Sequence, residues 1–120
     1  MNNAIIYCLC LHDNLYNSVK NLGYVPVGLG SKNFSDGWIT DSDGDNISHK
    51  NPNYGEHSFH YWLWKNYLNN VNENWIGFCQ YRKYWSLNFT PNDKINLDNL
   101  KDKVLRNIPD ELDRYEVILG

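Results

Sequence analysis

The residues with the clearest chemical potential form one short run, from Gln80 to Trp85, directly after an apolar segment. Arg82 and Lys83 stand side by side in this run, next to Tyr81. A guanidinium can bind phosphate through two parallel hydrogen bonds, and a lysine ammonium can neutralise it as a point charge. The aromatic rings can stack on a sugar or a base. We therefore predict a phosphate-binding site here, the alternative being a solvated strand end with aromatic residues at its rim.

Two further candidates, Glu56 and His57, lie where a predicted helix begins. Glu56 lies in the first turn, where a carboxylate suits the helix dipole. His57 and His60 are three residues apart, which places them on one helix face and would allow joint metal binding. No third ligand stands at a fixed spacing, so buried or hydrogen-bonded histidines are the favoured interpretation. We assign no metal site.

An acidic loop precedes this helix. Asp41, Asp43 and Asp45 reproduce the opening of a calcium-binding loop, but Asn46 stands where that loop requires glycine and Pro52 where it requires glutamate. We therefore reject a calcium loop. The Asp and Asn side chains are expected to form Asx turns that fix the shape of the loop, and their local function, if any, is to contact hydroxyl groups.

The elements that must position these residues alternate between strand and helix patterns. Strands are expected at 4–11, 24–29, 75–81 and 115–119, and helices at 14–22, 56–68 and 97–108. Pro26 indicates an edge or irregular strand, and Pro109 ends the last helix. The helix at 56–68 is apolar nearly all round, which predicts burial on all sides. The segment 28–54 is expected to be a long loop attached to the body of the domain.

This order of elements predicts an α/β fold with an open, mostly parallel sheet and flanking helices. Ligands of such sheets bind at the carboxyl ends of the strands. The run that starts at Gln80 would lie at that edge. The turn formed by His12 and Asp13 after the first strand would lie there too, although a polar turn is the commoner meaning of such residues.

Length and composition restrict the alternatives. The 120 residues suit one domain, and a net charge of -3 gives no positive field for a general nucleic-acid-binding protein. Three cysteines without CxxC spacing argue against a disulfide framework or a zinc site and favour a reducing compartment. The first apolar run is too short to cross a membrane, and it lacks the preceding basic residues that are typical of a signal peptide. Because the sequence ends at Gly120 as the last predicted strand completes, we expect further sequence or a partner to complete the domain.

Four stretches carry a resemblance to a known family: VGLGSKNF, TDSDGDNISHKNPNYGEHSFHYWLWKN, WIGFCQYRKYW and the weaker DRYEVILG. With these stretches the chain resembles the first half of a bacterial family of capsular and exopolysaccharide biosynthesis proteins, a domain of unknown function treated as glycosyltransferases. The matching positions are Asp45, Asn46, Ile47, Ser48, Asn51, Glu56, Tyr61, Trp64, Lys65, Asn66, Gly77, Cys79, Tyr81 and Arg82. Gln80 replaces a more frequent histidine, and Lys83 replaces a second arginine.

The resemblance implies a fold like the nucleotide-sugar-binding half of a GT-A-like glycosyltransferase. The implied reaction transfers a sugar from a nucleotide-activated donor to a glycan or lipid-linked acceptor, with Glu56 or His57 as the catalytic residue. The residues expected to bind the donor are Arg82, Lys83, Tyr81, Gln80, Asp45, Asn46, Ser48, Asn51 and Trp85.

Many related transferases hold a divalent metal on the donor diphosphate with paired aspartates at a strand end. This chain has QYRK at the corresponding place, without a carboxylate. No cofactor is therefore predicted, and Arg82 and Lys83 are expected to stabilise the leaving diphosphate directly. The expected location is cytoplasmic, with association at the inner face of the membrane left open. The alternative function is a non-catalytic carbohydrate- or nucleotide-binding module, or an inactive truncated relative.

Overall fold

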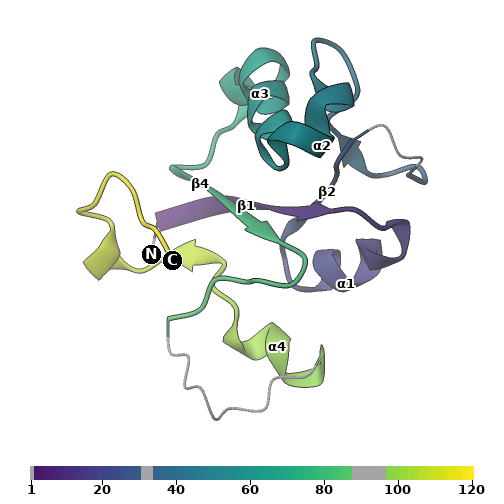
Figure 1. Ribbon diagram of the computed structural model, residues 1–120. Helices are drawn as coiled ribbons and strands as arrows, with labels where there is room; N and C mark the ends of the chain where they lie inside the picture. The colour runs from purple at the N-terminus through teal and green to yellow at the C-terminus, as the bar shows by residue number, and fades with distance from the viewer. Residues whose placement is uncertain (1, 31–33, 88–96) are drawn as a thin grey trace.

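The fold is built around a central strand, β1, that has neighbours on both sides (Figure 1). The computed structural model describes residues 2–30, 34–87 and 97–120. The strands are β1 (Asn2–Cys10), β2 (Val25–Gly28), β3 (Ile39–Thr40), β4 (Trp75–Gln80) and β5 (Asn107–Ile108). Their order is β3-β2-β1-β4 with parallel pairing throughout, and β5 pairs antiparallel with the start of β1. The predicted α/β fold with an open, mostly parallel sheet is confirmed.

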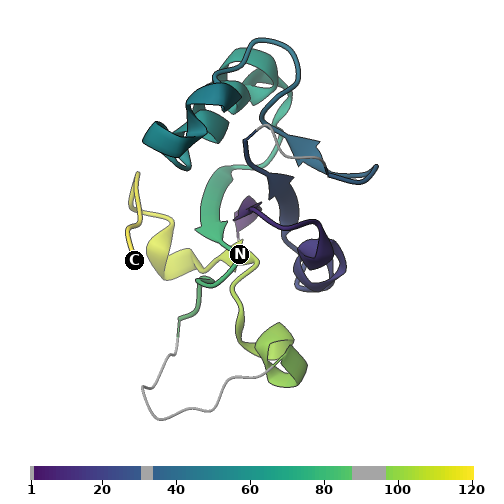
Figure 2. The same ribbon diagram turned by 45° about the vertical axis from the view of Figure 1, so that its right-hand side comes forward.

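Helices cover both faces of this sheet. The α-helices are α1 (Tyr16–Asn21), α2 (Asn51–Tyr54), α3 (His57–Asn66) and α4 (Leu97–Lys103), and the short 3-10 helices are η1 (Asp13–Leu15), η2 (Ser48–Lys50), η3 (Leu68–Asn70) and η4 (Asp110–Leu112). In both ribbon views α2 and α3 lie on one side of the sheet, and α1 and α4 on the other (Figures 1 and 2). None of the helices in the described parts of the chain has the length and apolar character needed to cross a bilayer.

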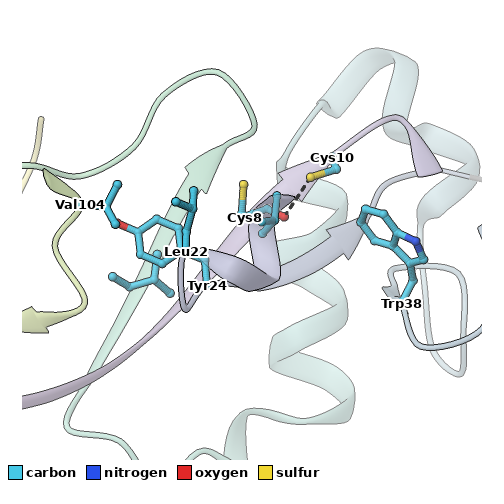
Figure 3. Close-up of a cluster of buried hydrophobic side chains, with 8 residues drawn as sticks. Cys8, Cys10, Leu22, Tyr24, Trp38 and Val104 are labelled. Carbon is cyan, nitrogen blue, oxygen red and sulfur yellow. Dashed lines mark hydrogen bonds between the residues drawn. The ribbon is translucent and has the colours of Figure 1, made fainter. Parts of the chain in front are cut away.

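The core has two layers because successive side chains of β1 point to opposite faces. One layer contains Ile6, Cys8, Cys10, Val19, Leu22, Tyr24, Trp38 and Val104 (Figure 3). The other contains Tyr7, Leu9, Val27, Leu29, Phe59 and Leu63. Both faces of β1 are thus buried, which explains its almost uninterrupted apolar sequence and confirms the strand predicted there.

Pro26 lies inside the sheet rather than at its edge, which corrects the prediction of an edge strand. The Leu29 amide donates to the Cys10 carbonyl of β1, and the Gly28 carbonyl accepts from the Asp41 amide after β3. Since backbone groups alternate in direction along a parallel strand, the nitrogen of Pro26 points toward the β3 side. The β3 pairing begins only at Val27, so the missing N–H removes no ladder hydrogen bond.

The predicted all-round burial of the helix at 56–68 is wrong. In α3 the residues Ser58, Phe59 and Leu63 are buried, whereas Trp64 is 60% exposed. The helix packs on one face of the sheet, and no other described element covers its outer side. The hydrophobic pattern of the sequence alone could not show which aromatic face of α3 would pack against the sheet.

Two predictions near the end of the chain are also corrected. The helix predicted at 97–108 ends at Lys103, because the Leu105 amide donates to the Trp85 carbonyl at 2.8 Å and Ile108 then pairs with Asn2 as part of β5. The strand predicted at 115–119 is not part of the described sheet. Leu119 is 88% exposed there, so a strand-like alternation exists without a strand to pair with.

One-sided packing of α3 gives a direct test. Phe59→Ala should lower the free energy of unfolding by about 3–5 kcal/mol, because the ring is fully buried with its centroid 5.1 Å from that of Tyr7. Trp64→Ala should cost less than about 1 kcal/mol, since this exposed ring meets the Lys65 ammonium, 4.1 Å from its centroid, and the Tyr61 ring edge-on at 5.9 Å. Urea unfolding followed by circular dichroism measures both values. Equal losses would contradict the packing described here.

Candidate functional site

Parallel pairing brings the ends of β1 and β4 to the same edge of the sheet. Leu9 is in register with Gln80, and the Tyr81 amide donates to the Leu9 carbonyl at 3.3 Å. The chain continues from β1 to His12, and from β4 to Tyr81 and Arg82. Both predicted site segments therefore leave the sheet at its carboxyl edge, where open α/β sheets bind ligands.

A tight turn fixes the backbone that carries the two cations. The Lys83 amide donates to the Gln80 carbonyl at 2.9 Å, and the two residues form an isolated antiparallel bridge. The Tyr84 hydroxyl donates to the Tyr81 carbonyl at 2.6 Å, which gives this carbonyl of the turn a partner. Arg82 is thereby held at the tip with its side chain exposed. We refer to this feature as the Gln80–Lys83 turn.

Two contacts join the turn to its surroundings, and a third lies within it. The ring of His12 meets the ring of Tyr81 edge-on at 5.9 Å between centroids, and the Arg82 guanidinium lies 5.1 Å from the Tyr81 ring centroid. The Gln80 amide donates to a Glu56 carboxylate oxygen at 3.1 Å. We call the five residues His12, Glu56, Gln80, Tyr81 and Arg82 the carboxyl-edge cluster. Segments from β1, β4 and the start of α3 meet in it.

His57 and His60 form a pair beside this cluster. Their Nδ1 atoms are 3.2 Å apart, so one ring donates a hydrogen bond and the other accepts it. The His60 ring packs against Phe78 at 4.4 Å between centroids, and burial lowers the pKa of His60, assisted by the neighbouring His57. A neutral His60 therefore orients His57, which is exposed in the first turn of α3.

A buried network holds the start of α3 in place. Asp41 has no exposed surface and accepts hydrogen bonds from the Gly30 amide at 2.9 Å and from the Ser58 hydroxyl. The side-chain amide of Asn51 donates to the Ser58 hydroxyl oxygen at 3.0 Å and to the Gly55 carbonyl at 2.8 Å. These contacts tie the end of β2, the loop after β3 and the first turn of α3 together, next to Glu56.

The loop residues predicted to contact sugar hydroxyls instead bond within the protein. The Asn46 side chain accepts from the Ser48 amide at 3.2 Å and donates to the carbonyls of Ser42 and Gly44, both at 2.9 Å. This is the expected Asx-type closure. Ser48 is buried, and the Asn51 amide is engaged in the network with Ser58. These side chains shape the loop that leads into α3.

Asp45 lies away from the carboxyl-edge cluster. Its carboxylate accepts from the Tyr61 hydroxyl at 2.9 Å, and its backbone carbonyl accepts from the Asn66 side chain at 2.7 Å. Asn66 is the last residue of α3, which has ten residues and therefore extends about 15 Å from its first turn. The structure thus separates Asp45 from Arg82 and Glu56, which the prediction had placed in one site.

Trp85 is positioned by the core. Its indole N–H donates to the Phe78 carbonyl at 2.9 Å, and its half-buried ring packs against the layer that contains Cys8 and Cys10. The ring belongs to the packing below the turn. Of the predicted donor-binding residues, the structure brings together Gln80, Tyr81, Arg82 and Lys83, with Glu56 and His57 beside them.

The electrostatics of the edge favour an anion. Within the described residues, neither Arg82 nor Lys83 is paired with a carboxylate, and Glu56 bonds to the neutral amide of Gln80. The guanidinium donors therefore remain available to a ligand. No group of three or more His, Cys, Asp or Glu side chains that could hold a metal ion occurs among residues 2–30, 34–87 and 97–120.

Sequence reasoning missed the structural importance of Asp41 and Ser58. Asp41 was one of three alternating aspartates, and nothing in the sequence distinguishes the buried one from the exposed Asp43 and Asp45. The distinction arises only when the loop folds back against Gly30 and α3. The weak candidate His12 joins the cluster through its contact with Tyr81.

The buried carboxyl of Asp41 predicts an unusual pH dependence. Burial raises the pKa of Asp41, so its protonated form favours the folded state, and this contribution is lost as the pH rises through the folded pKa. Asp41→Asn has no titratable group but still offers an acceptor to Gly30. The stability of the wild type relative to Asp41→Asn should therefore increase on acidification from about pH 7 to about pH 4.

Urea unfolding across this pH series measures that difference. Asp43→Asn removes an exposed carboxylate from the same loop and serves as the matched control. The burial described for Asp41 would be contradicted if the free energy of unfolding of the wild type, relative to that of Asp41→Asn, decreased on acidification. Asp41→Ala should lower the free energy of unfolding by about 1–3 kcal/mol for each hydrogen-bond donor that is left without an acceptor.

Comparison with known proteins places the chain in a family. No curated protein and no solved structure gave a significant match. A family model described as "Domain of unknown function (DUF4422)" matches residues 6–120, which includes every element of the carboxyl-edge cluster. The chain therefore belongs to this family, the domain of unknown function DUF4422.

Proposed function

We propose that the chain is the donor-binding part of a glycosyltransferase that takes a sugar from a nucleotide-activated donor to build a surface polysaccharide. One observation carries the proposal: the Gln80–Glu56 hydrogen bond joins a carboxylate to a turn at the carboxyl edge of a parallel sheet, and the two cations of this turn have no carboxylate partner among the described residues. The acceptor would be a glycan or a lipid-linked glycan, and the proposed place of action is the cytoplasm, at the inner face of the membrane. The resemblance to polysaccharide biosynthesis proteins supports this choice of product.

The Gln80–Lys83 turn supplies the proposed diphosphate site. Arg82 is held at the tip by the backbone bonds of the turn, and its guanidinium lies over the Tyr81 ring. A cation in a fixed position stabilises charge on the leaving diphosphate without the cost of reorganising at the moment of transfer. Lys83 supplies a second positive charge. Its ammonium acts as a point charge, because it lacks the planar, two-pronged guanidinium of arginine. Tyr81 offers the remaining ring surface to the nucleotide or sugar.

Glu56 and His57 supply the proposed proton acceptor. In the transfer, a bond forms between the acceptor oxygen and the anomeric carbon of the sugar, and the bond from that carbon to the diphosphate oxygen breaks. The hydroxyl proton passes to Glu56 or His57, and the electron pair leaves with the diphosphate, which Arg82 and Lys83 stabilise. Glu56 is connected through Gln80 to the turn, so proton acceptor and leaving-group site are held by one hydrogen-bonded unit.

A second candidate is a nucleotide-binding module without catalysis. It is favoured by the engagement of Asn46 and Asn51 in bonds within the protein, which leaves fewer polar side chains to recognise the sugar. Both candidates require the diphosphate site, and only the transferase requires Glu56 or His57 to accept a proton. The two experiments below separate them.

Calorimetric titration with uridine, guanosine and thymidine diphosphates tests the diphosphate site. Arg82→Ala should weaken binding about tenfold to hundredfold, because hydrogen bonds to charged groups are lost. Arg114→Ala is the matched control, since that guanidinium lies 4.9 Å from the Tyr115 ring just as Arg82 lies on Tyr81. No binding by the wild type, or equal losses in the two variants, would overturn the proposal. An absolute requirement for added Mg²⁺ would overturn the direct role of the cations.

Turnover separates transferase from binding module. Glu56→Gln preserves an acceptor for Gln80 but removes the carboxylate, so kcat should fall by about 10²–10⁴-fold while diphosphate affinity changes little. Release of the nucleoside diphosphate from nucleotide sugars in the presence of acceptor glycans measures this rate. If His57→Ala causes the large fall and Glu56→Gln does not, His57 is the base. Diphosphate binding without turnover for any donor would establish the binding module.

A further inference from the structure

A hollow of about 450 Å³ opens at the opposite end of the sheet from the carboxyl-edge cluster. It is lined by Asn2, Asn74, Trp75, Asp113, Tyr115 and Glu116. Asn2 begins β1 and Trp75 begins β4, while Asp113, Tyr115 and Glu116 belong to the segment after η4. Parts of the chain far apart in sequence thus meet in one concave surface.

Hydrogen bonds fix both walls of this hollow. The Trp75 indole N–H donates to an Asp113 carboxylate oxygen at 2.9 Å, which joins β4 to the segment after η4. The Asn74 amide donates to the Asn3 side chain at 3.0 Å, and Asn3 also pairs with β5. The Arg114 guanidinium donates to the Tyr115 hydroxyl at 2.8 Å and lies against one side of its ring.

The lining chemistry points to a neutral sugar. Two aromatic rings can stack on the apolar faces of sugar rings, and two amides and two carboxylates can bond to hydroxyl groups. A nucleoside diphosphate would meet the carboxylates of Asp113 and Glu116, and the adjacent Arg114 already donates to the Tyr115 hydroxyl, so like charges disfavour this ligand. The amides favour a polyhydroxyl ligand over a simple cation, because they also offer donors.

We infer that this hollow binds a neutral oligosaccharide, at a site separate from the carboxyl-edge cluster. The six residues of β4 place Trp75 about 16 Å from Gln80. A sugar in the hollow is therefore too far from Arg82 to be the one that reacts, and it would be a distant unit of a longer glycan. The inference does not depend on the proposed transfer reaction, since a binding module would use the same hollow.

Nuclear magnetic resonance can test the hollow directly. The probes are four neutral hexasaccharides, built from glucose, galactose, N-acetylglucosamine or rhamnose. Each is used at about 10 mM, because this is about ten times the Kd of a weak complex with millimolar affinity. The readout is the Trp75 indole N–H signal, assigned with Trp75→Phe among the five tryptophans. At least one hexasaccharide should shift this signal in a saturable manner. Tyr115→Ala should weaken that binding about tenfold through loss of a stacking ring.

Matched variants distinguish this site from the proposed donor site. Tyr54→Ala removes a tyrosine of similar exposure, 51% against 46% for Tyr115, and should leave the affinity unchanged. Glu116→Gln provides a second variant that removes only a charge from the lining. Arg82→Ala should weaken diphosphate binding about tenfold to hundredfold but leave the hexasaccharide shift unchanged. The inference is overturned if no hexasaccharide moves the Trp75 signal, if Tyr115→Ala and Glu116→Gln both bind as the wild type, or if a diphosphate alone causes the shift.

Discussion

The geometry of the candidate site depends on the burial of one carboxyl group. Asp41 lies in a loop, yet it has no exposed surface, and it accepts from Gly30 at the end of β2 and from Ser58 in the first turn of α3. Burying a carboxylate is costly unless hydrogen bonds compensate, so the loop, the strand end and the helix must adopt this arrangement together. Glu56 lies two residues from Ser58, so its position relative to Gln80 is determined by the same network.

The parallel sheet then divides the polar residues between two ends. Because β1 and β4 run in the same direction, the residues directly after the two strands lie at one edge of the sheet, and the first residues of both strands lie at the other. The basic Gln80–Lys83 turn is at the carboxyl edge, and the hollow with Asp113 and Glu116 is at the amino end. With a net charge of only -3, this separation is invisible in the composition and appears only in the fold.

The sequence predicted the elements whose pattern reflects burial on both faces. The strands at 4–11 and 75–81 were identified because both sides of β1 and β4 meet core residues, and their direction followed from the alternation of strands and helices. The aromatic face of α3 that includes Trp64 and the alternation at 115–119 were misinterpreted, because periodicity shows which residues share a face but not whether a partner covers it. Ile108 continued a helical spacing but pairs as a strand, since tertiary hydrogen bonds overrode the local pattern.

The position of the Gln80–Lys83 turn at the carboxyl edge could be predicted, because backbone direction determines it. The positions of the loop side chains could not, because they depend on which groups those side chains bond to. Gln80 and Arg82 had to leave β4 at the carboxyl edge, whatever their detailed contacts. Asp45 and Asn46 carry groups suited to sugar hydroxyls, but the same groups bond equally well to Tyr61, Ser48 and nearby carbonyls. A polar side chain in a long loop must satisfy the loop backbone before it can serve a ligand, because unpaired buried polar groups are costly.

The neutral partner of Glu56 has a consequence for anion binding. If this carboxylate paired with Arg82, a diphosphate would have to displace it and would gain little from the guanidinium. Gln80 occupies the carboxylate through its amide instead, so Glu56 stays fixed near the turn while the cations remain unpaired within the described residues. One glutamine thus keeps opposite charges close together without mutual neutralisation. That arrangement suits the proposed site, in which one group would bind a leaving phosphate and another would accept a proton.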